Sequence, residues 1–232
     1  MAFCQFQELA VIMLISYSHN FLFIHIYKTA GTSITSSLIP YSRFTDRIAY
    51  QYWPTRKMIN VLNWVFADKF NQFVTGFHKH ALLIEAQKKM GKQIFDSLFK
   101  FAFVRNPWDW RVSLYFYIKG AKKHRFYVKL QQMDFVDFVE WDIQQTPLRQ
   151  IDFLKDRNKQ MIVDFVGKYE NLDDDFNYVQ NKLSLEVEPL KKSNISGLRE
   201  YQDYRKYYDA KTAEKIYTYF KEDIDTFGYE FD

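Results

Sequence analysis

Two segments of the sequence place cations and hydroxyls where they could bind a phosphate or sulfate group. The first is KTAGTS, from Lys28 to Ser33, which directly follows the apolar run at 21–27. Backbone N–H groups entering a helix, a lysine and the hydroxyls of Thr29, Thr32 and Ser33 can converge on one phosphate. Taken alone, the segment fits an ordinary helix start better, with Thr32 or Ser33 as the capping residue and Lys28 solvated, because short clusters of Ser, Thr and Gly are common.

The second segment begins at Arg105, which ends another apolar run, and continues to Ser113 eight residues later. A guanidinium forms paired hydrogen bonds with a phosphate, and eight residues span about two helical turns. The alternative for Arg105 is an ion pair with Asp109 or another carboxylate. For Ser113, the alternative is a helix position without a role.

A general base is the remaining requirement of a group-transfer site, and His78 and His80 are the candidates. His80 precedes a predicted helix, whose dipole disfavours an imidazolium and keeps the ring able to accept a proton. The alternative is that His80 caps the helix and His78 lies at the surface. Glu85 is a second candidate base, ranked lower because it falls more than one turn into the predicted helix. No neighbouring Cys or His completes a metal site with the histidine pair, so no metal is expected.

Strands and helices must hold these residues in place. Strands are expected at 21–27, 98–105 and 161–167, and helices at 32–39, 57–72, 80–91, 106–120, 134–143, 171–184 and 205–222. Strands that alternate with helices predict an α/β fold with a central, mainly parallel sheet flanked by helices. Ligands of such sheets bind at the carboxyl ends of the strands, where both Lys28 and Arg105 are expected.

Composition narrows the function classes. A chain of 232 residues with 47% apolar residues fits one globular domain with a substantial core. The net charge of +4 suits an anionic ligand but is too small to indicate nucleic acid. The single cysteine, Cys4, excludes an intramolecular disulfide and fits a cytoplasmic protein, as it would a secreted one without disulfides. The apolar run at 9–15 is far too short to span a bilayer, so a soluble protein is expected.

Read together, FIHIYKTAGTS at 23–33 and FAFVRNPWDWRVSLYFY at 101–117 resemble the signature pair of the carbohydrate sulfotransferases. The likeness is to the heparan sulfate 2-O-sulfotransferase group and to small bacterial proteins of the same fold. It extends to VGKYENL at 166–172 and to the C-terminal segment. The resemblance implies a P-loop NTPase-like sandwich and a single sulfotransferase domain over 1–232. Residues 1–12 are a possible N-terminal extension.

The resemblance also implies a donor and roles for individual residues. The donor is 3'-phosphoadenosine 5'-phosphosulfate (PAPS), used without a metal, and sulfuryl transfer is an in-line displacement like phosphoryl transfer. His80 is the implied base with His78 in support, and Lys28 stabilises charge on the leaving oxygen. The implied cofactor-binding residues are Lys28, Thr29, Ala30, Gly31, Thr32, Ser33, Arg105, Ser113 and Ser196.

The implied acceptor is a saccharide hydroxyl, and the basic segment 119–129 either binds an acidic glycan or forms a solvated charged face. The chain departs from the family at Tyr27, where proline is usual, so a looser loop is expected. A nucleotide kinase is one alternative, but its phosphate loop carries the lysine after the glycines, whereas Lys28 precedes Gly31. A non-catalytic nucleotide- or glycan-binding protein of the same fold is the other. It would not require His80 or Lys28, and both are present.

Overall fold

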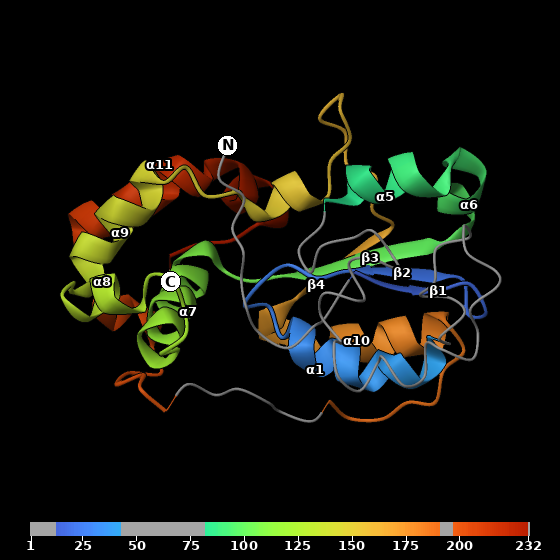
Figure 1. The fold of residues 1–232 in the computed structure, drawn as a ribbon, viewed down its shortest axis with the longest axis horizontal. Coiled ribbons are helices and arrows are strands. Elements are labelled where there is room, and N and C mark those ends of the chain that lie inside the picture. The colour runs from blue at the N-terminus through green and yellow to red at the C-terminus, as the bar shows by residue number, and fades with distance from the viewer. Residues whose placement is uncertain (1–12, 43–81, 191–196, 232) are drawn as a thin grey trace. The chain divides into compact units, whose positions relative to one another are not determined.

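The computed structural model describes residues 13–42, 82–190 and 197–231 (Figure 1). These residues form two compact units, one within 9–104 and 152–193 and the other within 105–151 and 194–232. In the described ranges, no helix combines the length and the apolar character needed to cross a membrane. The expectation of a single domain over 1–232 stays a prediction. The helix expected near 57–72 lies outside the described residues.

The first unit contains a four-stranded sheet in the order β1-β2-β3-β4. Strands β2 (Phe21–Ile24), β3 (Phe99–Val104) and β4 (Phe165–Lys168) are parallel, and β1 (Leu14–Ser16) runs antiparallel to β2. The mainly parallel α/β sheet expected from the sequence is therefore confirmed. The edge strand β1 was not predicted.

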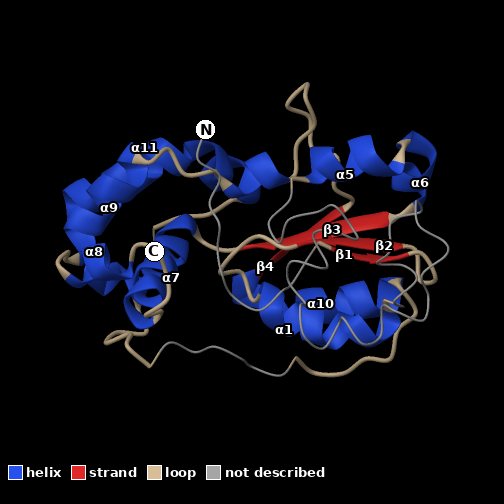
Figure 2. Ribbon diagram, in the orientation of Figure 1, coloured by secondary structure: helices blue, strands red, loops and turns tan. Residues whose placement is uncertain are grey.

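Helices cover both faces of this sheet (Figure 2). Helices α1 (Gly31–Leu38) and α10 (Leu172–Lys182) lie on one face, and α5 (Leu83–Met90) and α6 (Lys92–Ser97) lie on the other. Side chains alternate between the faces of a strand, so every second residue of β2 and β3 points toward α1 and α10. The resulting core contains Phe21, Phe23, Ile34, Leu38, Phe101, Phe103, Phe176 and Val179.

Two strands differ from the predicted ranges. β2 ends at Ile24 rather than at residue 27, and a turn follows at 27–30, in which the Thr29 hydroxyl donates to the Ile26 carbonyl. β4 begins at Phe165 rather than at residue 161. The preceding Asp164 is held by Lys100, whose backbone N–H and ammonium both contact its carboxylate at 2.7 Å. Apolar composition alone does not reveal either limit.

The second unit is helical. It contains α7 (Pro107–Gly120), α8 (Tyr127–Gln131), α9 (Phe135–Gln144) and α11 (Ala210–Phe227). The predictions for α7 and α9 are confirmed. Both helices have a side-chain N-cap, since Asn106 accepts from the Trp108 N–H and Asp134 from the Asp137 N–H.

The last helix begins later than predicted. Its first residue is Ala210 rather than residue 205, because Asp209 caps the helix by accepting from the Thr212 N–H. The residues expected to open it, Tyr204–Tyr207, form the separate short 3₁₀ helix η4. The helix continues to Phe227 and ends at Gly228, which has a φ of 61°.

Candidate functional site

The loop between β2 and α1 makes a tight turn in left-handed backbone conformations. Lys28 has a φ of 64° and Ala30 a φ of 63°. Such conformations cost a non-glycine residue about 1–2 kcal/mol, and they persist only where the surroundings fix them. Thr29, between the two, is 1% exposed, and its hydroxyl donates to the Ile26 carbonyl at 2.9 Å. The Thr29 side chain therefore holds the turn together.

The single glycine of this loop is required by a close approach. A Cβ atom at Gly31 would lie 1.9 Å from Cδ2 and 2.1 Å from Nε2 of His25. The His25 imidazole, directly after β2, is buried, with 4% exposed. The start of α1 therefore packs directly on this ring, and no larger residue fits at position 31.

No side chain caps the start of α1. The N-cap position is held by Ala30, whose carbonyl accepts from the Ile34 N–H at 3.1 Å. The alternative in which Thr32 or Ser33 caps the helix is therefore wrong. The first turn of a helix leaves N–H groups without intrahelical partners, and the helix dipole is positive there. The first turn of α1 contains no acidic residue, and the partly exposed Lys28 precedes it. The loop is thus suited to bind an anion.

Tyr27, which stands where the resemblance has proline, packs edge-on against Phe153 with 6.2 Å between the ring centroids. An aromatic contact is therefore present at the position where proline would restrict φ.

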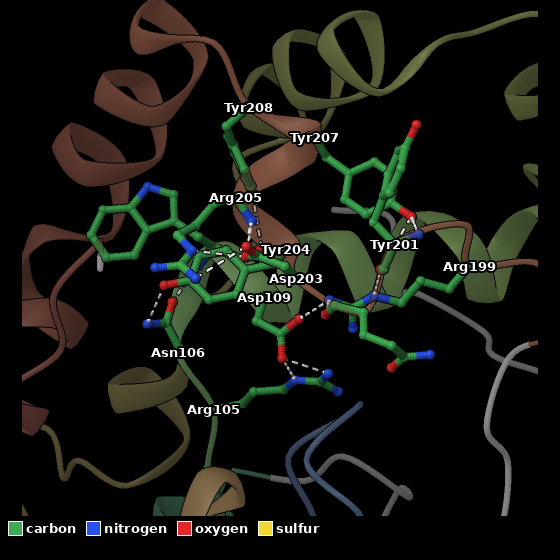
Figure 3. A network of polar contacts seen from close by, with 12 residues as sticks. Arg105, Asn106, Asp109, Arg199, Tyr201, Asp203, Tyr204, Arg205, Tyr207 and Tyr208 are labelled. Carbon is green, nitrogen blue, oxygen red and sulfur yellow. Dashed lines mark hydrogen bonds and ion pairs between the residues drawn. The ribbon is translucent and has the colours of Figure 1, made fainter.

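The second anion-binding candidate, Arg105, is ion-paired to Asp109 at the start of α7 (Figure 3). Its Nε donates to Asp109 Oδ2 at 2.7 Å, and its Nη2 lies 2.6 Å from the same oxygen. The side chain of Arg105 is 7% exposed and that of Asp109 13%. The ion pair with Asp109, stated above as the alternative to phosphate binding by Arg105, is therefore present. Asp109 thus takes the Nε–Nη2 side of the guanidinium.

A second arginine shares the same carboxylate. Arg199 Nη2 lies 2.8 Å from Asp109 Oδ1, so Asp109 stands between two guanidinium groups (Figure 3). Arg199 is held in turn by the carbonyls of Tyr201, at 2.8 Å from Nε, and Gln202, at 2.6 Å from Nη2. The two cations and one anion leave a net positive charge at the start of α7.

Sequence reasoning missed Arg199. It selected Ser196 from the same polar segment, and Ser196 lies outside the described residues. The polar composition of the segment could be read from the sequence. The partner of Arg199, Asp109, is far away in the sequence, and only the fold brings the two residues together.

Ser113 lies on α7 four residues after Asp109 and is partly exposed. Residues four apart lie on the same face of a helix. The helix therefore presents the Arg105 partner and the Ser113 hydroxyl in one direction.

The candidate base residues His78 and His80 lie outside the described residues. The alternative base, Glu85, needs a correction. The sequence predicted that Glu85 lies more than one turn into the helix. Because α5 begins at Leu83, Glu85 lies in its first turn instead. An acidic residue is favourable at that place because of the helix dipole. Within 13–42, 82–190 and 197–231, no group of three or more His, Cys, Asp or Glu side chains could hold a metal ion.

The basic segment 119–129 contributes to a groove along α8 and α9. Arg125 and Lys129 line the groove together with Trp141, over whose ring the Lys129 ammonium lies at 5.0 Å. Two carboxylates, Asp137 and Glu140, line it as well. The groove therefore combines an aromatic ring with charges of both signs.

Comparison with known proteins identifies the family of the chain. A family model described as "Sulfotransferase family" matches residues 12–230, a range that includes the loop at 28–33 as well as Arg105 and Ser113. A protein of Archaeoglobus fulgidus, named only as uncharacterized, is 36% identical over 108 residues. That alignment covers 44% of this chain and 81% of the relative. No solved structure matches the chain significantly.

Proposed function

We propose that this chain, which belongs to the sulfotransferase family, transfers a sulfuryl group from PAPS to a hydroxyl of a saccharide. Membership in the family supports sulfuryl transfer, and PAPS is the donor that the family generally uses. The observation that carries the donor proposal is the start of α1, where an uncapped helix N-terminus follows Lys28. The saccharide acceptor rests on the resemblance of the two motifs to carbohydrate sulfotransferases.

The loop at 28–33 is the proposed site of the 5'-phosphosulfate. The N–H groups of Gly31, Thr32 and Ser33 belong to the first turn of α1 and can donate to the anion. Thr29 contributes by fixing the turn, and Ala30 by starting the helix without a capping side chain. The Lys28 ammonium is proposed to stabilise the charge that forms on the leaving phosphate oxygen.

The start of α7 is the proposed site of the 3'-phosphate. Arg105 is proposed to donate to the phosphate through its guanidinium, and Ser113 through its hydroxyl. Ser196 is proposed from the same resemblance. Arg199 adds a second guanidinium beside Asp109, and we include it among the residues that attract the phosphate.

Chemistry at the acceptor needs a base. His80 is proposed to take the proton of the acceptor hydroxyl while the new S–O bond forms and the bond to the phosphate oxygen of the donor breaks. His78 is proposed to support it, and Glu85 remains the alternative base. No metal is needed in this scheme, because Lys28 and the helix N-terminus supply the positive charge.

The acceptor surface is proposed to include the groove along α8 and α9. Trp141 offers an aromatic ring, and Arg125 and Lys129 offer cations for an acidic saccharide. The alternative is a chain that binds nucleotide or glycan without catalysis.

Calorimetry with adenosine 3',5'-bisphosphate, the product expected from PAPS, tests the donor site. The titration is run in EDTA and compared with Mg·ATP. The bisphosphate should bind in EDTA, and Lys28→Ala and Arg105→Ala should each weaken it about tenfold or more. Lys129→Ala removes an exposed cation outside the proposed donor site and is the matched control. Preference for Mg·ATP, or equal affinity of all four proteins for the bisphosphate, would overturn the proposed donor.

A further inference from the structure

The backbone of Arg105 is held by a side chain. The Arg105 N–H donates to Gln150 Oε1 at 2.8 Å, and Gln150 Nε2 donates to the Arg105 carbonyl at 2.7 Å. Gln150 is 0% exposed. Its amide therefore makes with Arg105 the two bonds that a residue on a neighbouring strand would make.

Gln150 is itself held by α11. The carboxylate of Asp223 accepts from the Gln150 N–H and from the Ile151 N–H, each at 2.8 Å. These two residues open the 3₁₀ helix η2 (Gln150–Phe153), and Asp223 is 0% exposed. A carboxylate that accepts two backbone N–H bonds fixes the position and direction of the turn that carries Gln150.

We infer that Gln150 is a positioning residue for Arg105, and that Asp223 acts through Gln150. The inference rests on the proposed function, in which Arg105 binds the 3'-phosphate. The Gln150 amide fixes φ and ψ at Arg105 and so fixes the direction of its Cα–Cβ bond. Asp109 fixes the other end, the guanidinium. An arginine held at both ends is ordered before the ligand arrives, so binding costs less conformational entropy.

A purely structural role would also satisfy two buried backbone groups, so stability alone cannot separate the two roles. The separating quantity is the affinity gained from the 3'-phosphate. It is the ratio of the dissociation constants of adenosine 5'-monophosphate and adenosine 3',5'-bisphosphate. A global loss of stability weakens the binding of both ligands together, whereas a misplaced Arg105 weakens the binding of the bisphosphate alone.

The test measures this ratio calorimetrically for the full chain and its Gln150→Leu and Gln150→Glu variants. Both variants should lower the ratio about tenfold while leaving the monophosphate affinity unchanged. Gln150→Glu keeps the shape and can still accept from the Arg105 N–H, but in its ionised form it cannot donate to the Arg105 carbonyl. It is the informative variant if Gln150→Leu does not fold. Asp223→Asn should lower the ratio by a smaller factor, because one acceptor oxygen remains.

Gln180 on α10 supplies the matched control. It is 1% exposed, and its Nε2 donates to the carbonyls of Glu186 at 3.2 Å and Glu188 at 3.3 Å. Gln180→Leu should lower the stability and leave the ratio unchanged.

The outcomes separate the inference from the proposed function. The positioning role is overturned if the ratio is large in the unmodified chain and lost in Arg105→Ala, but unchanged in both Gln150 variants. A ratio near one in the unmodified chain, or a ratio that Arg105→Ala leaves unchanged, overturns the 3'-phosphate assignment on which the inference rests.

Discussion

Gly31 lies against the imidazole of His25 so closely that a Cβ atom at position 31 would be 1.9 Å from His25 Cδ2. The two residues sit on either side of the strained turn, in which Lys28 and Ala30 have positive φ values. Loop shape and helix start are therefore coupled through one ring-to-backbone contact.

Gly31→Ala should destabilise the chain, because the methyl group must displace either the ring or the helix start. Overpacking of this kind costs about 1–3 kcal/mol. The His25→Ala/Gly31→Ala double variant removes the clash, so its cost should be clearly less than the sum of the two single costs. Urea unfolding of the four proteins measures the coupling. Additive costs would contradict the contact.

Asp164→Ala should destabilise the sheet by about 2–3 kcal/mol, less than a fully buried pair, because Asp164 is 43% exposed. The loss leaves the Lys100 ammonium, on a side chain only 8% exposed, with carbonyl partners such as that of Leu98. Lys100→Met should destabilise the chain less than Asp164→Ala, because it removes the buried ammonium and leaves only the partly exposed Asp164 carboxylate without its ion-pair partner. Denaturant unfolding compares the two. Bisphosphate affinity should not change in either variant, because Lys100 lies near the amino end of β3.

Asp142→Ala should be among the more damaging changes in the helical unit. It leaves the fully buried Arg111 without the carboxylate that lies 2.9 Å from its Nη1, at a cost of about 3–5 kcal/mol. Arg111 also stacks on Trp110, with its Cζ 3.7 Å from the ring centroid.

The Arg111→Met/Asp142→Leu double variant replaces both charges by apolar groups, so it should be more stable than Asp142→Ala alone. Urea unfolding again gives the comparison. A double variant less stable than Asp142→Ala would show that the ion pair itself, rather than the absence of an unpaired charge, stabilises this unit.

Stability should fall above pH 10 because of Tyr208. Burial raises the pKa of its hydroxyl well above 10, and the hydroxyl donates to the Trp108 carbonyl at 2.9 Å. Below pH 10 the hydroxyl keeps its proton in the folded and the unfolded chain, so stability does not depend on it. Above pH 10 the unfolded chain loses the proton first, which favours unfolding.

Tyr208→Phe removes this dependence together with one hydrogen bond worth about 1 kcal/mol. The unmodified chain should therefore be more stable than Tyr208→Phe at pH 8, and the difference should shrink between pH 10 and 11. Urea unfolding at each pH measures it. A difference that is constant up to pH 11 would mean that Tyr208 ionises equally easily in both states.

The sequence predicted those elements whose signals are local. α7 could be placed because Pro107 and the Asn106 cap mark its start, and β3 because a continuous apolar run marks a buried strand. The start of α11 was misplaced because Tyr204–Tyr207 continue the helical pattern, while the Asp209 cap decides the limit. The limit of β4 depends on Lys100, which is distant in the sequence.

In the candidate site, too, local features could be predicted from the sequence and contacts between distant residues could not. Residues 28–33 and Arg105 could be recognised as anion-binding candidates from residue type and order. The left-handed backbone conformation of Lys28 and Ala30 could not be predicted, because neither residue type favours it. Neither the pairing of Arg199 with Asp109 nor the support of Arg105 by Gln150 could be predicted. Both join residues that only the fold brings together.

Transfer of ³⁵S-labelled sulfuryl from PAPS to a mixture of saccharides, measured in EDTA, tests the proposed chemistry most directly. Label should appear in a saccharide fraction with the unmodified chain. His80→Ala should reduce the rate about a hundredfold or more while leaving the bisphosphate affinity unchanged. Lys28→Ala should reduce both the rate and the affinity. An undiminished rate in His80→Ala would contradict the assigned base. Transfer of label from the γ-phosphate of Mg·ATP, with none from PAPS, would contradict the sulfotransferase activity itself.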